Sequence, residues 1–177
     1  MFVKLAQFVN IMLYVLVAGV MWGTWLSLGR TMTSYDATTF LADGKHMISN
    51  LATVMAVLMV SAAVVGLLVV VLLFRRRSNA GGWLALIGLL LMLAVVAITL
   101  AVEVPIDNQI KTWTVDTLPA DWQDIRARWA AFHTLRTFLS LAAVAAGVGA
   151  ALTGAVKVVP NRGHEHRDMA LRGGSPR

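Results

Sequence analysis

The sequence contains no cysteine, and only 14% of its residues are charged. The lack of cysteine excludes disulfide bonds, iron–sulfur clusters, covalently attached c-type haem and any redox cycle that uses a pair of thiols. A soluble domain has about 25% charged residues. The scarcity of charge, together with 58% hydrophobic residues, therefore indicates an integral membrane protein. No segment repeats at a fixed period, and a length of 177 residues favours a single membrane domain.

Four stretches are apolar over about 20 residues or more, the length that a helix needs to cross a hydrocarbon core about 30 Å thick. They are residues 5–28, 51–74, 83–102 and 132–159. Lipid offers no hydrogen-bond partners, so the backbone of each stretch must bond within itself. The expected fold class is therefore all-α, a bundle of four transmembrane helices over residues 1–160. Only Lys4 precedes the first stretch, which is longer than the apolar region of a signal peptide, so we expect it to be retained.

Basic residues mark one side of the membrane. Three consecutive arginines, residues 75–77, lie between the second and third stretches, and cytoplasmic loops carry an excess of Lys and Arg. This pattern predicts that both termini are cytoplasmic, in the cytoplasmic membrane of a bacterium. The net charge of +6 then orients the chain and attracts anionic lipid headgroups. Nucleic acid is not an expected partner, because the basic residues form no groove or aromatic platform. Residues 161–177 are polar and basic and are predicted to be a disordered cytoplasmic tail.

The fourth helix carries a polar and aromatic stripe. Residues at successive spacings of three and four share one face of a helix. The stripe consists of Trp122, Arg126, Trp129, His133, Arg136 and Ser140, and continues as Ala143, Gly147, Ala151 and Gly154. Small residues at this spacing let another helix approach closely, so we expect His133 and Arg136 to point into the bundle. The stripe also predicts that this helix reaches outward to about Trp122 and is the longest of the four. The alternative is that Arg136 extends to the lipid headgroups.

A charged side chain inside a membrane bundle needs a partner. Glu103, at the outer end of the third helix, is the best candidate for Arg136, and Thr99 lies one turn deeper. Two outward loops are expected around residues 30–45 and 105–121. Other helices offer further groups to the same region: His46 and Asn50 on the second, and Trp22 and Trp25 on the first. The two tryptophans are alternatively interfacial anchors. The pair Gly19 and Gly23 predicts close packing of the first helix.

The segments TLAVEVPIDNQIKTW and DWQDIRARWAAFHTLRT, with LVAGVMWGTW in the first helix, resemble the anthrone-oxygenase-like family of four-helix membrane proteins. That family has a Thr ahead of an Asn-x-Pro-x-Asn-type segment, then a Trp, an Asn or His, and an Arg that open the fourth helix. The residues that fit this pattern are Thr99, Pro105, Asn108, Trp129, His133 and Arg136. The resemblance covers about residues 5–155. Glu103 and His133 stand where many relatives carry Asn, which replaces a neutral amide by a titratable group.

The resemblance implies an oxygenase that converts polycyclic phenolic anthrones to anthraquinones without a metal or flavin. In this interpretation His133 removes a proton as a general base and Arg136, held by Glu103, stabilises the developing oxyanion. The anion then reacts with O₂. The residues expected to form the pocket are Trp129, Asn108, Trp22, Trp25, Thr99, Asn50 and His46. No cofactor is expected.

Two alternatives stay open. A metal bound by Glu103, His133 and His46 would have ligand types that suit iron, copper or zinc, although no HxxxH spacing supports it, and a haem between His46 and His133 has still less support. The other alternative is non-enzymatic: a lipid- or quinone-binding protein, or a structural subunit of a larger membrane complex. The expected partners are membrane lipids and a lipophilic small molecule, with a homo-oligomer or a larger assembly as further options.

Overall fold

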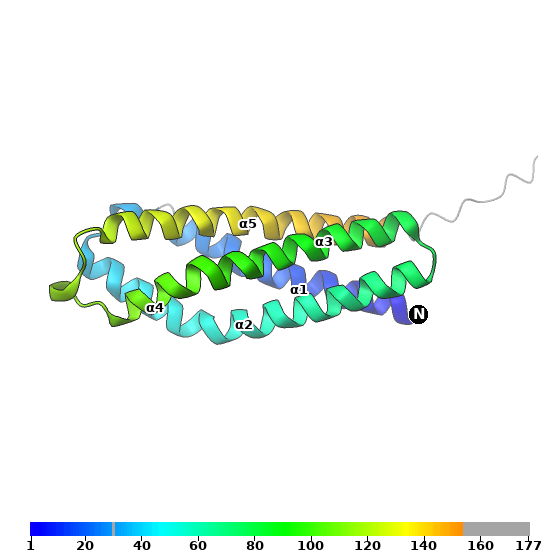
Figure 1. Cartoon of the computed structure of the whole chain (residues 1–177), viewed down its shortest axis with the longest axis horizontal. Helices are drawn as coiled ribbons and strands as arrows, with labels where there is room; N and C mark the ends of the chain where they lie inside the picture. The colour runs from blue at the N-terminus through cyan, green and yellow to red at the C-terminus, as the bar shows by residue number, and fades with distance from the viewer. Residues whose placement is uncertain (30, 154–177) are drawn as a thin grey trace, which may run out of the picture.

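The chain folds into four long helical segments in the computed structural model, which describes residues 1–29 and 31–153. They are α1 Phe2–Thr24, α2 Ala37–Arg75, α3 Asn79–Ile98 with its continuation α4 Val104–Thr112, and α5 Trp122–Thr153 (Figure 1). Two π-helical turns, η1 Trp25–Gly29 and η3 Thr99–Glu103, extend α1 and α3, and two short 3₁₀ turns, η2 Met32–Ser34 and η4 Val115–Thr117, lie in the connections. Each segment is long and apolar enough to span a membrane. The predicted all-α bundle of four transmembrane helices is confirmed, whereas the predicted disordered tail lies outside the described residues.

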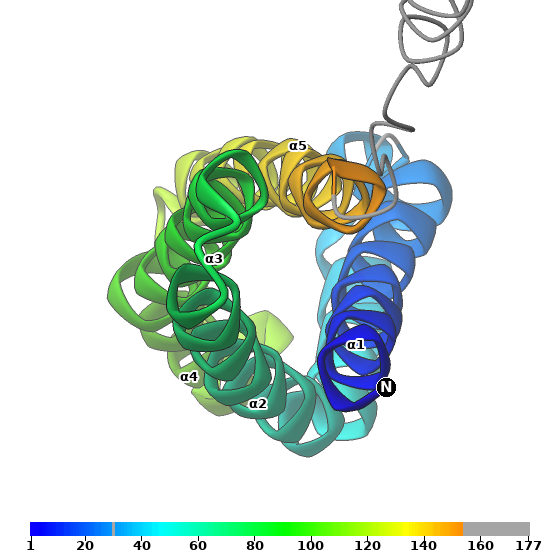
Figure 2. The same cartoon turned by 90° about the vertical axis from the view of Figure 1, so that its right-hand side faces the viewer.

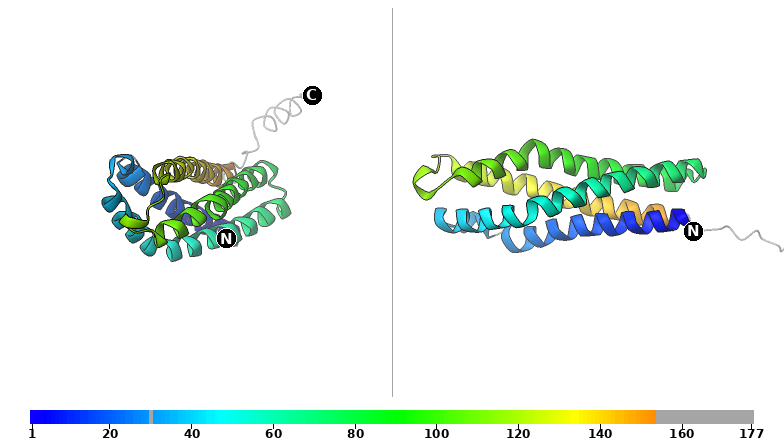
Figure 3. Two further views of the ribbon diagram at one scale, coloured as in Figure 1. Left: turned by 60° about the vertical axis from the view of Figure 1, so that its left-hand side comes forward. Right: turned by 90° about the horizontal axis from the view of Figure 1, so that it is seen from below.

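The four segments form a square in which each packs against two neighbours. Helix α1 lies beside α2 and α5, and α3 lies on the other side of the same two helices, as the end-on view shows (Figure 2). The N-terminus, the α2–α3 connection with its three arginines, and the last described turn of α5 share one end, which we call the proximal end (Figure 1). The connections that contain η2 and η4 lie at the other end, the distal end (Figure 3).

Helix α2 is longer than its apolar stretch. Its first turn is capped by Asp36, whose side chain accepts a hydrogen bond from the Thr39 amide at 2.8 Å, and such a cap fixes where a helix begins. With 39 residues, α2 is the longest helix in the described part of the chain, where α5 has 32 residues, so the prediction that the fourth helix is longest does not hold over the described residues. The prediction that the fourth helix begins near Trp122 is confirmed. Both distal loops are shorter than predicted, because α2 begins at Ala37 and α4 continues to Thr112.

Small residues shape the contacts between helices. A Cβ at Gly147 would lie 3.7 Å from Ile11 and 3.8 Å from the Tyr14 ring, which confirms that this face of α5 packs against α1. Gly154 lies outside the described residues. The prediction of close packing at Gly19 and Gly23 is wrong, since no described atom of another helix would lie within 4 Å of a Cβ at either position. The buried face of α1 is formed instead by residues on roughly the opposite side, namely Tyr14, Val17, Ala18 and Met21.

Arg126 links the start of α5 to the connection between α1 and α2. Its guanidinium donates to the carbonyl oxygens of Tyr35 at 3.0 Å and Thr33 at 2.9 Å, both in the connection between α1 and α2. The same group lies 4.8 Å from the centre of the Trp122 ring and 5.8 Å from that of Phe40. Stacking on aromatic faces and hydrogen bonds to carbonyls are both favourable for guanidinium, so the start of α5 is fixed against the start of α2.

Candidate functional site

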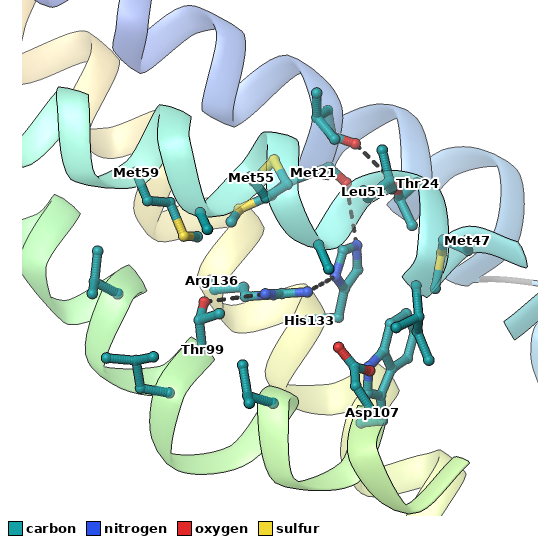
Figure 4. Close-up of a pocket in the computed structure, with 18 of the residues that line it drawn as sticks. Met21, Thr24, Met47, Leu51, Met55, Met59, Thr99, Asp107, His133 and Arg136 are labelled. Atoms are coloured by element: carbon teal, nitrogen blue, oxygen red, sulfur yellow. Dashed lines mark hydrogen bonds between the residues drawn. The ribbon is translucent and has the colours of Figure 1, made fainter. Parts of the chain in front are cut away.

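A cavity of about 250 Å³ lies in the distal half of the bundle, between α2 and the α3–α4 segment, with α1 and α5 behind it (Figure 4). Most of its wall is apolar, and four of its lining residues are methionines: Met21, Met47, Met55 and Met59. The polar and aromatic groups in the lining come mainly from α5 and the α3–α4 segment. They are Thr24, Thr99, Asp107, Trp129, His133 and Arg136. An apolar cavity with a few converging polar groups is the usual form of a small-molecule site.

Arg136 links α5 to the π turn η3 at the floor of this cavity. One terminal nitrogen donates to the Thr99 hydroxyl at 3.1 Å, and the other donates to Nδ1 of His133 at 3.0 Å (Figure 4). The second nitrogen also lies 2.9 Å from a carboxylate oxygen of Glu103. The predicted ion pair between Glu103 and Arg136 therefore forms, and the side chain of Arg136 is only 12% exposed. It points into the bundle, which contradicts the alternative that it extends to the headgroups.

Glu103 is completely buried, and it contacts Arg136 by charge rather than by a directed hydrogen bond. Neither of its carboxylate oxygens has a hydrogen-bond partner among the described residues, although a terminal nitrogen of Arg136 lies 2.9 Å from one of them. Glu103 is also not among the residues that line the cavity. Its place is thus beneath Arg136, where it supplies negative charge to the guanidinium.

The hydrogen bonds of His133 fix its tautomer. Its Nδ1 must accept, because an arginine nitrogen can only donate, and its Nε2 lies 3.2 Å from the Met21 carbonyl oxygen, which can only accept. The proton is therefore on Nε2, and both ring nitrogens are engaged. The ring also stacks on Trp129, with centroids 5.0 Å apart and planes 4° from parallel. His133 has no free nitrogen in this arrangement.

A π-helical turn places Glu103 and Asp107 on the cavity side of the third segment. In η3 the Val104 amide donates to the Thr99 carbonyl, five residues back, instead of four. This wider turn precedes Pro105, which has no amide proton to continue an ordinary helix. Single π turns of this kind are frequent at functional sites. The helix then continues as α4, and it is this continuation that carries Asp107 toward Trp129.

Asp107 is the residue that sequence reasoning missed. It is half-buried, it lines the cavity, and its Oδ1 accepts from the indole nitrogen of Trp129 at 3.2 Å. Its Oδ2 makes no hydrogen bond within the part of the chain that the structure describes. Asp107 falls within the outward loop expected around residues 105–121, so it was not expected on the same helical face as Thr99 and Glu103. The spacing of four that links Thr99, Glu103 and Asp107 is the signal that could have placed it on the same face.

Five of the seven residues predicted to form the pocket do not reach the cavity. His46 and Asn50 are exposed on the outer face of α2. Asn108 is exposed on α4 and accepts from the Lys111 ammonium at 3.2 Å. Trp22 and Trp25 stack on each other and pack against Phe138 of α5, and the Trp25 indole donates to Thr134.

The pocket-facing positions of α1 are taken instead by Val20, Met21 and Thr24. Three residues were predicted as metal ligands: Glu103, His133 and His46. Glu103 and His133 both contact Arg136, whereas His46 lies on the exposed face of α2. Across residues 1–29 and 31–153, no three His, Cys, Asp or Glu residues gather closely enough to hold a metal ion.

The model of a family described as anthrone oxygenase matches residues 45–146, more than half of the chain. The matched segment runs from the distal part of α2 into α5 and contains every residue of the polar cluster. These residues are Thr99, Glu103, Asp107, Trp129, His133 and Arg136. No curated protein and no solved structure matches the chain. The chain is a membrane protein with four spanning helices, and it belongs to the anthrone oxygenase family.

Proposed function

We propose that this chain is a membrane-bound oxygenase that oxidises a lipophilic aromatic substrate, an anthrone or a related phenol, with O₂. One observation carries the proposal: Asp107 and Arg136 face the same apolar cavity inside the membrane-spanning part of the bundle. A carboxylate can accept a proton, and a guanidinium can stabilise the oxyanion that its removal creates. Membership of the anthrone oxygenase family supports the same reaction class.

The proposed reaction begins at the CH₂ group between two aromatic rings. Asp107 accepts a proton from this carbon, and the electron pair moves onto the conjugated carbonyl oxygen, which faces Arg136. The carbanion form then reduces O₂ and bonds to it, and the resulting peroxide anion takes back the proton from Asp107 to give a hydroperoxide at the same carbon. Loss of the second proton from that carbon and cleavage of the O–O bond leave a carbonyl group and water. The balance is R₂CH₂ + O₂ → R₂C=O + H₂O, with O₂ as the only oxidant.

His133 acts in this scheme as a positioning residue. The family resemblance implies that His133 is the general base, but both of its ring nitrogens are engaged, one by Arg136 and one by the Met21 carbonyl. Its hydrogen bond orients the guanidinium toward the cavity, and its stacking on Trp129 aligns the indole that holds Asp107. The proton acceptor proposed here is therefore Asp107. We propose no cofactor, because the substrate anion itself supplies the electrons.

The test measures O₂ consumption by the purified protein in detergent with anthrone as substrate, after subtraction of the uncatalysed rate and with and without a metal chelator. We expect one O₂ consumed per anthraquinone formed, unchanged by the chelator, and a loss of about 10²-fold or more in Asp107→Asn, which keeps the hydrogen bond to Trp129 but cannot accept the proton. Asp116→Asn is the matched control, since Asp116 is an exposed carboxylate at the same end of the bundle.

Two results would contradict the proposal. Full activity in Asp107→Asn would remove its role as proton acceptor. A wild-type protein that binds the substrate but consumes no O₂ would favour the non-enzymatic alternative, a lipid- or quinone-binding protein.

We also propose that both termini face the cytoplasm of a bacterial cell. The proximal end carries the N-terminus and Arg75, Arg76 and Arg77 (Figure 1), and basic residues favour the cytoplasmic side. The cavity then lies in the half of the bundle that is farther from the cytoplasm, where the lipophilic substrate and surrounding lipids are its proposed partners.

A further inference from the structure

One side of the cavity wall differs from the rest in its exposure. Of the residues that line the cavity, those on α1 and α5 are buried or half-buried. The exposed ones all come from two facing segments, α2 and the stretch from η3 into α4. They are Ala52, Ala56, Val60, Leu100 and Val104. The cavity therefore opens between these two segments, on the side away from α1 and α5.

The opening faces the membrane rather than water. Val60 and Leu100 are each 64% exposed, and both lie within the apolar stretches 51–74 and 83–102 of spanning segments. Exposed apolar side chains at this depth contact lipid, since a spanning helix presents its free face to the hydrocarbon core. Ala52 and Val104 stand near the outer edge of the same stretches. The mouth thus extends from the hydrocarbon core toward the interface.

Two local features explain why the cavity opens between α2 and the stretch from η3 into α4. Ala52 and Ala56 are one helical turn apart on the flank of α2, and neither side chain is large enough to reach across to the facing segment. On the other side, the π turn Thr99–Glu103 widens the helix where Leu100 lies. Figure 4 shows side chains from α2 and from the α3–α4 segment on opposite sides of the polar groups of Arg136, His133 and Asp107.

We infer that the ligand enters sideways from the lipid, through a portal formed by Ala52, Ala56 and Val60 on one side and Leu100 and Val104 on the other. This inference rests on the proposed function for the ligand class: a flat apolar molecule dissolved in the bilayer, with its oxygen end turned toward Arg136. A lipid acyl chain does not fit as the occupant, because it offers nothing to the guanidinium or to Asp107. Aromatic molecules with a polar edge collect near the membrane interface, toward which the portal extends. Ala56, at the middle of the α2 side, sets the width of ligand that can pass.

The chain has no cysteine, so a single introduced thiol tests the lipid contact directly. Ala56→Cys is labelled with a bimane fluorophore and reconstituted into phosphatidylcholine vesicles that contain lipids with a nitroxide in the acyl chain. The matched control is Val64→Cys, which is on the same helix, 63% exposed as the native valine, and outside the cavity. We expect the nitroxide to quench both labels, and 1,8-dihydroxyanthraquinone, added as a ligand, to relieve quenching at position 56 only. A label at position 56 that lipid nitroxides do not quench would overturn the portal.

A second variant tests passage itself. Ala56→Trp fills the mouth, and Val64→Trp adds the same side chain elsewhere on α2. In vesicles, 1,8-dihydroxyanthraquinone should associate with Ala56→Trp about tenfold or more slowly than with the wild type, because entry then requires the helices to separate, and steps that need a conformational change slow association. Val64→Trp should bind at the wild-type rate. Equal rates in all three proteins, or no binding to the wild type, would overturn the inference.

Both readouts measure lipid contact and binding, not turnover. The portal therefore stands if the wild-type protein binds the ligand through it but consumes no O₂, although the proposed function fails. Conversely, O₂ consumption with unchanged association in Ala56→Trp would leave the proposed function intact and exclude the portal.

Discussion

Removing Arg136 should destabilise the bundle more than removing Glu103, although the two side chains form one ion pair. The Glu103 carboxylate is completely buried and has no hydrogen-bond partner among the described residues, so Arg136 is its source of compensation. The guanidinium, in contrast, keeps the Thr99 hydroxyl, His133 and the charge of Asp107 when Glu103 is neutralised. The perturbations are Arg136→Met, Glu103→Gln and the double variant.

The magnitude follows from the separation and burial of the pair. At 2.9 Å and an effective dielectric constant of about 20, two unit charges attract by about 6 kcal/mol, most of which offsets their desolvation. Breaking one partner of a buried pair typically costs about 3–5 kcal/mol, and this is the loss expected for Arg136→Met. For Glu103→Gln we expect about 1–3 kcal/mol, the cost of a poorly satisfied buried group. The double variant should lose less than the sum, with a coupling of about 2–3 kcal/mol.

The assay is equilibrium unfolding in mixed detergent micelles, followed by tryptophan fluorescence. Arg128→Met serves as the control, because Arg128 is exposed on the same helix, and its effect should stay within about 0.5 kcal/mol. Additive losses in the cycle would refute the coupling between the two charges. A larger loss for Glu103→Gln than for Arg136→Met would refute the argument from unequal compensation.

Three further predictions concern other parts of the bundle. A cysteine at Asn79 should react with an impermeant maleimide only after cells are opened; labelling from outside intact cells would reverse the proposed orientation. Gly66→Ala should cost about 1–3 kcal/mol by overpacking, because a Cβ there would lie 2.6 Å from the Tyr14 hydroxyl. Gly19→Ala should not lower the stability of the protein in the same unfolding assay, because no described atom of another helix would lie within 4 Å of the added Cβ. The hydrogen bonds from Thr39 hold the pKa of Asp36 below its usual value of 3.8, so the ionised cap stabilises the start of α2 above that value and is lost as the pH falls through the lowered pKa. Exchange protection of the first turn of α2 should fall there in the wild type but not in Asp36→Asn.

The sequence was most informative where helical spacing and membrane burial agree. On α5, Trp129, His133 and Arg136 share a face with Gly147, and the structure places all four on the inward side of the bundle. The need of a buried arginine for a counter-charge was then enough to identify Glu103. These two inferences recover the centre of the candidate site.

The sequence was misleading where the same spacing occurs outside the apolar stretches. His46 and Asn50 also share a helical face, but the distal turns of α2 extend beyond its apolar stretch, and there a polar face marks the exposed side rather than the interior. Asp107 was missed for a different reason. A π turn changes the register of a helix by one residue, and whether Pro105 ends the helix or follows such a turn depends on the contacts of η3 with α5.

The methionine wall of the cavity has a consequence for the range of molecules that it can accommodate. Met21, Met47, Met55 and Met59 face the polar cluster from α1 and α2, and an unbranched thioether side chain changes rotamer at little cost. Ring systems of different outline can therefore be seated by moving sulfur atoms, while Arg136 and Asp107 stay fixed on the opposite side. The same thioethers can be oxidised to sulfoxides, which are polar and would make this wall hydrophilic. The same four side chains thus allow the cavity to accept different ring shapes and make it sensitive to oxidation.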